Sequence, residues 1–201
     1  MSSAAANADV IYNEGFDDVA NLAAAGWVQS NNSTPGGETG WFQGNSGIFA
    51  AESGAADSYI AANYLNAGLG GNVDNWLITP VFHIEQATLI TFATRTAGGL
   101  PGDNLEVLYS LGGTNTSDFF SLGSILSAVY PIDWGTFSLV GTGTADIRLA
   151  FRYLVTDTLN NGDYIGIDSL SVAVPEPSTI ALFAAALLMM FVATRRRRGQ
   201  I

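Results

Sequence analysis

Acidic side chains are the residues of this chain best equipped for chemistry. Strand periodicity places Glu14 on one face with Phe16 and Asp168 on one face with Leu170, so both carboxyl groups are expected to point towards a core. A carboxylate in such a place must be protonated, paired with a cation, or set at a rim that water reaches. The residues ahead of Val174 contain three arginines against 17 acidic side chains, so arginine can pair with few of them.

A hard divalent cation is the alternative partner for these carboxylates. Ca²⁺ is bound by several carboxylate and carbonyl oxygens, which this composition can supply. The pattern therefore predicts a structural Ca²⁺ held by Glu14 and Asp168, with Asp17 and Asp74 as further ligands. The competing interpretation is that Glu14 and Asp168 are rim residues that accept hydrogen bonds from a turn or a strand edge.

Nucleophilic catalysis has little support in this sequence. The chain contains no cysteine and one histidine, His83, and no Gly-x-Ser-x-Gly sequence accompanies it. His83 lies opposite Phe82 and Ile84 in a strand-like run, so we expect it to face solvent. We predict a protein that is not an enzyme. The alternative is a secreted carbohydrate-active hydrolase that uses two carboxylates, because 17 acidic residues offer many pairs and no spacing selects one.

The charge of the chain is divided between two regions. Every acidic residue except Glu176 and three of the seven arginines lie in residues 1–173, which gives that region a net charge of −14. Such a surface repels nucleic acid and anionic membranes, so divalent cations and neutral polymers are the better partners. Four tryptophans could stack on sugars if they were exposed together, whereas packing in the core is the alternative. They are Trp27, Trp41, Trp76 and Trp134.

Short strand-like runs separated by turn residues fill the chain up to Val172. Within residues 146–153 every second residue is apolar, and Arg148 and Arg152 face the other way. The sequence therefore predicts an all-β antiparallel β-sandwich. The expected strands are residues 10–16, 47–51, 59–63, 75–82, 87–95, 104–110, 134–140, 146–155 and 164–172, and the expected loops are residues 31–40, 68–72, 98–104 and 112–118.

The last residues of the chain, 174–201, have a different character. An apolar run of 14 residues, from Ile180 to Ala193, has no polar stripe and is followed by Arg195, Arg196, Arg197 and Arg198. As a helix the run would be about 21 Å long, against about 30 Å for the hydrocarbon core of a bilayer. We therefore expect a single short hydrophobic helix that spans the membrane only marginally. The arginines would stop it on the cytoplasmic side.

This tail closely resembles the PEP-CTERM sorting signal of Gram-negative bacteria. The resemblance rests on Pro175, Glu176 and Pro177, followed by the short apolar run and the arginine cluster at the extreme C-terminus. It implies that an exosortase-type enzyme recognises the tail and cleaves near the Pro-Glu-Pro sequence. Residues 179–194 would then insert in the inner membrane only transiently.

The N-terminal segment, residues 1–9, carries a second hint of export. It has neither a basic region nor an apolar core, yet Ala6-Asn7-Ala8 has the small-x-small form of a signal-peptidase site. We interpret the segment as the remnant of a signal-peptide cleavage region. An alanine-rich start with no such role is the alternative.

Residues 10–173 resemble the choice-of-anchor J domain, which is similar to cleaved adhesin and MAM-like jelly-roll modules. The sequences that carry the resemblance occur in series. They are Glu14-Gly15-Phe16-Asp17, Gly26-Trp27, Trp41, Asp74-Asn75-Trp76-Leu77-Ile78-Thr79-Pro80, Ala150-Phe151-Arg152 and Gly166-Ile167-Asp168-Ser169-Leu170. The resemblance implies a jelly roll, and related jelly rolls imply a similar pairing of first-strand and last-strand acids. Asp168-Ser169 stands where Asp-Asp is frequent, which puts a second ligand there in doubt.

Together these features predict a non-enzymatic, exported module that is sorted to the cell surface or the extracellular matrix of a Gram-negative bacterium. The expected domains are residues 1–9, 10–173 and 174–201. The expected partners are an exosortase-type enzyme, the inner membrane and extracellular polysaccharide. A permanently anchored structural protein is a further alternative.

Overall fold

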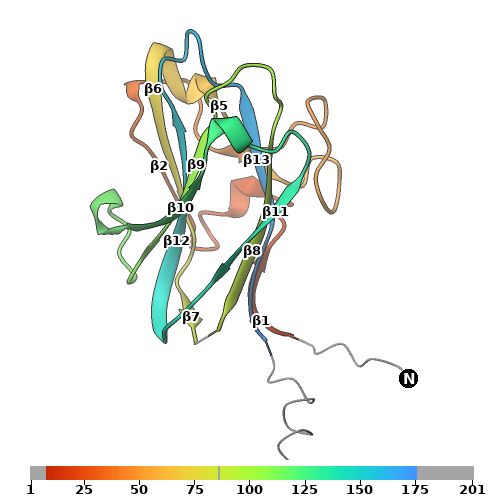
Figure 1. The fold of residues 1–201 in the computed structure, drawn as a ribbon, viewed down its shortest axis with the longest axis vertical. Helices are drawn as coiled ribbons and strands as arrows, with labels where there is room; N and C mark the ends of the chain where they lie inside the picture. Colours follow the sequence, from red (N-terminus) through yellow and green to blue (C-terminus); the bar gives the residue numbers. More distant parts are fainter. Residues whose placement is uncertain (1–7, 86, 176–201) are drawn as a thin grey trace, which may run out of the picture.

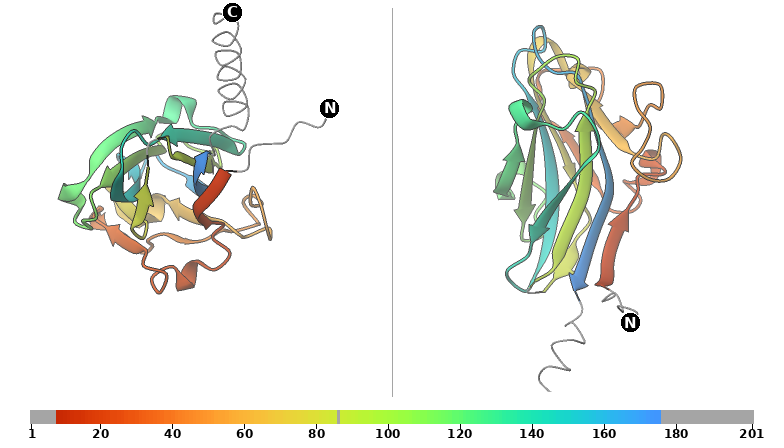
Figure 2. Two further views of the ribbon diagram at one scale, coloured as in Figure 1. Left: turned by 90° about the horizontal axis from the view of Figure 1, so that it is seen from below. Right: turned by 45° about the vertical axis from the view of Figure 1, so that its right-hand side comes forward.

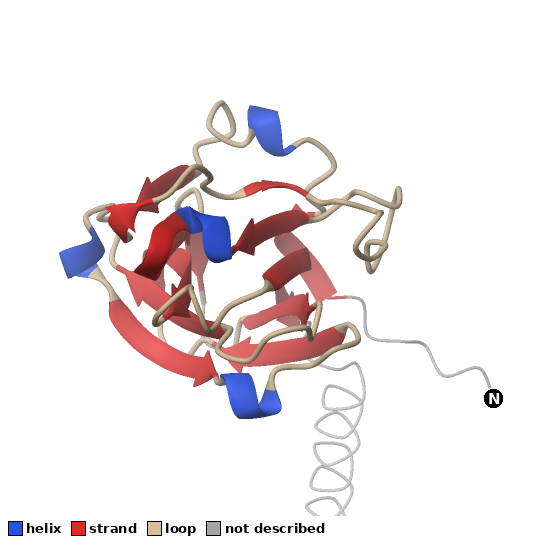
Figure 3. Ribbon diagram, turned by 90° about the horizontal axis from the view of Figure 1, so that it is seen from above, coloured by secondary structure: helices blue, strands red, loops and turns tan. Residues whose placement is uncertain are grey.

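The computed structural model describes residues 8–85 and 87–175, which form two antiparallel β-sheets packed face to face (Figure 1). This part of the chain contains no α-helix, and its four short 3₁₀-helices lie in connections between strands (Figure 3). The predicted all-β jelly-roll sandwich is confirmed. The strands are β1 (Ala8–Glu14), β2 (Val28–Asn31), β3 (Thr34–Gly36), β4 (Phe42–Gln43), β5 (Ile60–Asn63), β6 (Ala67–Ile78), β7 (Phe82–Ile84), β8 (Leu89–Thr96), β9 (Asn104–Ser110), β10 (Phe120–Ile125), β11 (Gly135–Val140), β12 (Ala145–Val155) and β13 (Tyr164–Pro175). The 3₁₀-helices are η1 (Val19–Asn21), η2 (Tyr64–Asn66), η3 (Thr116–Asp118) and η4 (Ser127–Val129).

A long strand lies at the centre of each sheet, β13 in sheet A and β12 in sheet B. Sheet A has the order β11-β8-β13-β5-β4, and sheet B has the order β10-β9-β12-β6-β2. β1 is a further partner of β13, and β3 and β7 pair with β6 and β12. One edge of β13 pairs with β8, and the other pairs first with β5 and then with β1. The first and last described strands therefore run side by side, as Figure 2 shows.

Alternating side chains bury one face of each sheet. In β12, Leu149, Phe151 and Tyr153 are fully buried between the sheets, whereas Arg148 and Arg152 lie on the outer face. The pairing of β12 with β6 and β9 therefore follows the period-two pattern of the sequence. Phe151 meets Phe92 of sheet A edge to face at 5.0 Å between ring centroids, which shows that the two inner faces interlock.

Three of the expected segments differ in the structure. Residues 68–72 were expected to form a loop, but they belong to β6 and pair with β3. A Cβ atom on Gly68 or Gly71 would lie 2.8 Å from Pro35, so the glycines allow the two strands to approach closely. Residues 47–51 were expected to form a strand, but they form the end of a turn and irregular chain, and Phe49 within them is buried against the outer face of sheet A. Residues 31–40 were expected to be a loop and contain the short strand β3.

The predicted C-terminal helix and arginine cluster lie outside the described residues, as do residues 1–7. Within residues 8–85 and 87–175, no helix has the length and apolar character that a membrane crossing requires.

A buried carboxyl group links the two sheets. Asp103 is 2% exposed and accepts hydrogen bonds from the hydroxyl groups of Thr96 in sheet A, at 2.5 Å, and Tyr153 in sheet B, at 2.6 Å. The backbone N–H of Asp163 is a third donor, at 2.9 Å. Burial raises the pKa of Asp103 above its usual range despite these donors.

This raised pKa predicts a pH-dependent contribution to stability. The folded chain binds the Asp103 proton more tightly than the unfolded chain does, so this contribution grows as the pH falls from neutral through the folded pKa towards about 3.9. The substitution Asp103→Asn removes the contribution. In urea unfolding, the free energy of unfolding of the native chain should rise relative to that of D103N as the pH falls, by about 1.4 kcal/mol for each unit by which folding raises the pKa.

Asp133→Asn is the matched control, because the Asp133 side chain is 95% exposed and should leave the pH profile unchanged. A difference between the native chain and D103N that stays constant from pH 7 to pH 4 would contradict the prediction.

Candidate functional site

A β-bulge in the last strand decides where Asp168 points. The register between β13 and β8 shifts between Asp168 and Ser171, and Ser169 adopts a φ of 52°. Ile167 before the bulge and Leu170 after it both lie in the core between the sheets, so Asp168 is on the outer face. The prediction that Asp168 shares the face of Leu170 is therefore wrong, because strict alternation is interrupted between them.

Asp168 is nevertheless fully buried, because the loop of residues 44–59 covers it. Its Oδ2 atom accepts hydrogen bonds from the backbone N–H groups of Glu52, at 2.9 Å, and Ser53, at 3.1 Å. Ser169 donates its own N–H to Oδ1 and its hydroxyl to the Glu52 carboxylate, at 2.6 Å. Burial raises the pKa of Asp168. The side chain fastens the loop, which is the orange segment beside β13 in Figure 1.

Aromatic side chains complete this attachment. Phe49 stacks on Tyr59 at 5.0 Å between centroids and meets Tyr164 of β13 edge to face. The Arg95 guanidinium lies 4.3 Å from the centre of the Phe49 ring, and Trp134 donates its indole N–H to the carbonyl of Ala50. These contacts make the outer face of sheet A a second buried cluster.

Two of the other predicted calcium ligands lie at the edge of this loop. Glu14 is half-buried and accepts the N–H of Phe16, whereas the exposed Asp17 carboxylate accepts no hydrogen bond from the described residues. Both side chains line a shallow cavity of about 340 Å³, together with Ser53 and Ser169. We call this cavity the Glu14–Asp17 corner. Asp168 contacts it through Ser53, whose backbone N–H donates a hydrogen bond to Asp168.

Asp74 lies elsewhere, on the outer face of sheet B, with its charge balanced by Arg152. Among residues 8–85 and 87–175, no three histidine, cysteine, aspartate or glutamate side chains are grouped so that they could hold a metal ion. The structure thus brings Glu14 and Asp17 together beside Asp168 and separates Asp74 from them. The calcium site stays a prediction.

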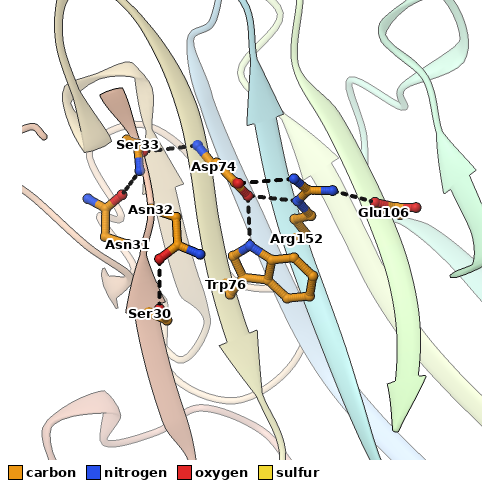
Figure 4. A network of polar contacts seen from close by, with 8 residues as sticks. All are labelled: Ser30, Asn31, Asn32, Ser33, Asp74, Trp76, Glu106 and Arg152. Carbon is orange, nitrogen blue, oxygen red and sulfur yellow. Dashed lines mark hydrogen bonds and ion pairs between the residues drawn. The ribbon is translucent and has the colours of Figure 1, made fainter. Parts of the chain in front are cut away.

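Arg152 is the centre of an ordered polar network across sheet B (Figure 4). Its guanidinium donates to both oxygens of Asp74, at 2.7 and 3.0 Å, and to Glu106, at 3.2 Å. The hydrogen bonds with Asp74 raise the pKa of Arg152, so the group stays charged. Trp76 donates its N–H to Asp74 at 2.7 Å. Its ring also lies against the Arg152 guanidinium, whose Cζ is 4.8 Å from the ring centre.

Strand register assembles this network. Arg152 of β12 is opposite Glu106 of β9 and Trp76 of β6, and Trp76 is in turn opposite Ser30 of β2. The sequence pattern placed Arg152 on the outer face of its strand but did not pair it with Glu106, because alternation within one strand does not determine the order of the strands. A cavity of about 480 Å³ lies over the β9 side of the network, lined in part by Asn104, Glu106 and Arg152.

The remaining candidate residues are His83 and the four tryptophans, and each contacts other residues of the protein. His83 is exposed, as predicted, and its Nδ1 lies 2.7 Å from the exposed carboxylate of Asp146. Trp27, Trp41 and Trp76 are at most 5% exposed, and Trp134 packs on Phe49. The tryptophans therefore follow the core-packing alternative and form no exposed platform.

The sorting motif begins inside the sheet. The sequence pattern of the PEP-CTERM protein-sorting motif matches residues 173–198. In the structure Ala173 pairs with Val10, and Pro175 pairs with Ala8 as the last residue of β13. The chain therefore carries a protein-sorting signal that starts where the folded module ends.

Solved structures with a similar fold are adhesin domains. The K2 cleaved adhesin domain of Lys-gingipain superposes with a TM-score of 0.60 at 21% identity, covering 80% of this chain and 98% of that chain. The K1 and K3 domains of the Porphyromonas gingivalis W83 protein give TM-scores of 0.59 and 0.61 at 20% and 18% identity, covering 81% and 84% of this chain and 97% and 99% of theirs. At these identities the likeness shows the fold. No curated protein sequence matches the chain.

The attachment of the 44–59 loop can be tested directly. Asp168→Ala leaves the N–H groups of Glu52 and Ser53 without an acceptor, which should lower the free energy of unfolding by about 1–3 kcal/mol. The loop should also become the first site of protease cleavage. Urea unfolding and limited proteolysis measure both effects.

Asp57→Ala, in the same loop, is the control, because the exposed Asp57 side chain accepts no hydrogen bond from the described residues. Equal stability and equal protease resistance of the two variants would contradict the role of Asp168.

Proposed function

We propose that this chain is the exported precursor of a non-enzymatic surface module that binds extracellular polysaccharide. An exosortase-type enzyme recognises its tail in the inner membrane of a Gram-negative bacterium and cleaves near Pro-Glu-Pro. The module then remains at the cell surface or in the surrounding matrix. The observation that carries the proposal is the match to the sorting motif, which begins at the last residues of β13.

The charge distribution supports this destination. The module has a net charge of −14, whereas the tail carries four consecutive arginines after its apolar run. Only the tail is suited to the cytoplasmic side of a membrane. The module itself is repelled by nucleic acid and by anionic lipid.

The outer face of sheet B is the best candidate for a glycan surface. Sugars are bound by polar side chains whose positions are fixed before the ligand arrives. Arg152 of β12 fixes Glu106 of β9 and Asp74 of β6, and these charged side chains line one cavity together with apolar side chains. Glu106 uses only its Oε2 atom in the network, so Oε1 can accept a sugar hydroxyl.

A hydrolase with two catalytic carboxylates is less well supported. Two carboxyl groups among the described residues have a raised pKa, Asp103 and Asp168, and suit a general acid by that criterion. Both are shut inside the fold, at 2% and 0% exposure, and their oxygens accept hydrogen bonds from the protein. Neither can reach a glycosidic bond.

Electrophoresis through gels that contain neutral polysaccharides tests the glycan surface. The native chain should be retarded in at least one of a panel of galactan, xylan and β-glucan gels. Glu106→Gln keeps the shape of the side chain but weakens its hydrogen bonds to sugar hydroxyls, so the affinity should fall by about tenfold.

Asp146→Asn makes the same acid-to-amide change on an exposed residue of sheet B, away from the cavity, and should bind like the native chain. Free migration of the native chain in every gel, or equal retardation of both variants, would exclude this surface.

We also propose that a structural Ca²⁺ binds at the Glu14–Asp17 corner, beside the loop that Asp168 fastens. The oxygens of Asp168 already accept backbone N–H groups, so this carboxylate is not included as a ligand. The corner offers oxygen ligands only, which suits this cation, and Asp17 is free to bind it. Asp74 is not included, because Arg152 already neutralises it.

Calcium in excess should raise the melting temperature of the native chain by about 5–10 °C, because the ion binds the folded state alone. Asp17→Asn should abolish the rise, and Glu38→Gln, an exposed residue outside the corner, should retain it. A melting curve that neither calcium nor a chelator changes would refute the metal site.

A further inference from the structure

An apolar opening separates the edges of the two sheets at the lower end of the module. β10 is the edge strand of sheet B and β11 is the edge strand of sheet A, and within the described part of the chain neither has a second partner. Between them is a cavity of about 430 Å³ with no charged residue in its lining. We call this opening the β10–β11 seam. Its apolar lining includes Ile84, Ile90, Leu111, Leu122, Leu139 and Val140.

Large apolar side chains at the seam are left in water. Leu111 is 71% exposed and Val140 is 62% exposed. Leu122 of β10 is 42% exposed in the same lining, and Phe120 at the start of β10 is 60% exposed beside Tyr109 of the lining. Exposed apolar side chains gathered around one cavity mark a binding site.

The end of the described chain lies close to this seam. Ala173 of β13 pairs with Leu89 of β8, and Leu89 pairs with Val140 of β11. Two strand spacings, about 10 Å, therefore separate the end of β13 from the lining of the seam. β7, the β11–β12 turn and the end of β13 lie together at the lower end of the molecule (Figures 1 and 2).

The chain beyond Pro175 can reach the seam and matches its chemistry. Three residues, 176–178, precede Thr179 and span at most about 10 Å when extended. They are followed by the 14 uncharged residues from Ile180 to Ala193. A second copy of the module fits less well, because each module has a net charge of −14, whereas the four arginines of the tail are attracted to that charge.

We propose that the β10–β11 seam binds the apolar segment 180–193 of its own chain and shelters it from water until it enters the membrane. The mode is an apolar segment laid into an apolar groove, with a few of its side chains filling the cavity. The proposal rests on the proposed sorting function only for the later transfer to the membrane. The docking needs neither the exosortase nor a glycan.

Cysteine cross-linking of the full chain tests the docking. The chain has no native cysteine, so only the introduced cysteines can form a disulfide. The pair Leu111→Cys and Ala186→Cys joins the seam to the middle of the apolar segment. The control pair is Val10→Cys and Ala186→Cys. Val10 is 53% exposed and pairs with Ala173, so it is near the chain end but outside the seam.

Docking predicts that the seam pair forms an intramolecular disulfide at least about tenfold faster than the control pair, since a bound segment has a much higher effective concentration. Leu122→Asn should reduce the rate to that of the control, because it places an unpaired amide in the contact. Leu122 is 42% exposed, so the fold should tolerate the change. Vesicles of phosphatidylethanolamine and phosphatidylglycerol should also suppress the disulfide.

Equal rates for the two pairs would overturn the proposal. Disulfide-linked dimers as the main product would assign the seam to a second copy and would overturn it as well. An intramolecular disulfide that vesicles leave unchanged would refute transfer to the membrane. Failure of the proposed sorting function would leave the cross-linking rates in solution unaffected, so the two failures are distinguishable.

Discussion

The pairing of β13 is the constraint on which the rest of the module depends. This strand is hydrogen-bonded to β8 along one edge and to β5 and β1 along the other. It therefore cannot be completed until the N-terminal strand is in place, a long-range contact that closes almost the whole chain. Its last residue, Pro175, is also the first proline of the sorting sequence. Folding of the module and presentation of the signal thus meet at one residue.

The surplus of acidic side chains is handled in three different ways. Asp168 is satisfied by backbone N–H groups of a covering loop, Asp103 mainly by hydroxyl groups of both sheets, and Asp74 by Arg152. Each solution uses a different partner because arginine is scarce in the module. Acids with no such partner, of which Asp17 is one, remain available for a cation.

Much of the fold follows from the sequence because alternation is a local property. Residues 104–110 and 146–155 were predicted almost to the residue, since each strand has one buried and one wet face. The start of β6 was missed because its glycines resemble a turn, although they serve close contact with Pro35. The residues 47–51 were misassigned because Phe49 satisfies an apolar pattern without belonging to a sheet.

The candidate sites were less predictable, because they depend on contacts between distant residues. A bulge at Ser169 reverses the face of Asp168, and no residue pattern announced it. The Arg152 network required the order of β9, β12 and β6, and Asp103 stood in a segment expected to be a loop. The sorting motif was predicted from the sequence because its information is linear: a short motif, an apolar run and a charge cluster.

Mass spectrometry of the protein recovered from the surface of its native host tests most directly whether module and tail separate at the Pro-Glu-Pro sequence. Sorting with cleavage predicts a mature C-terminus between Pro175 and Ser178. A surface form that still carries Arg195 to Arg198 would contradict it.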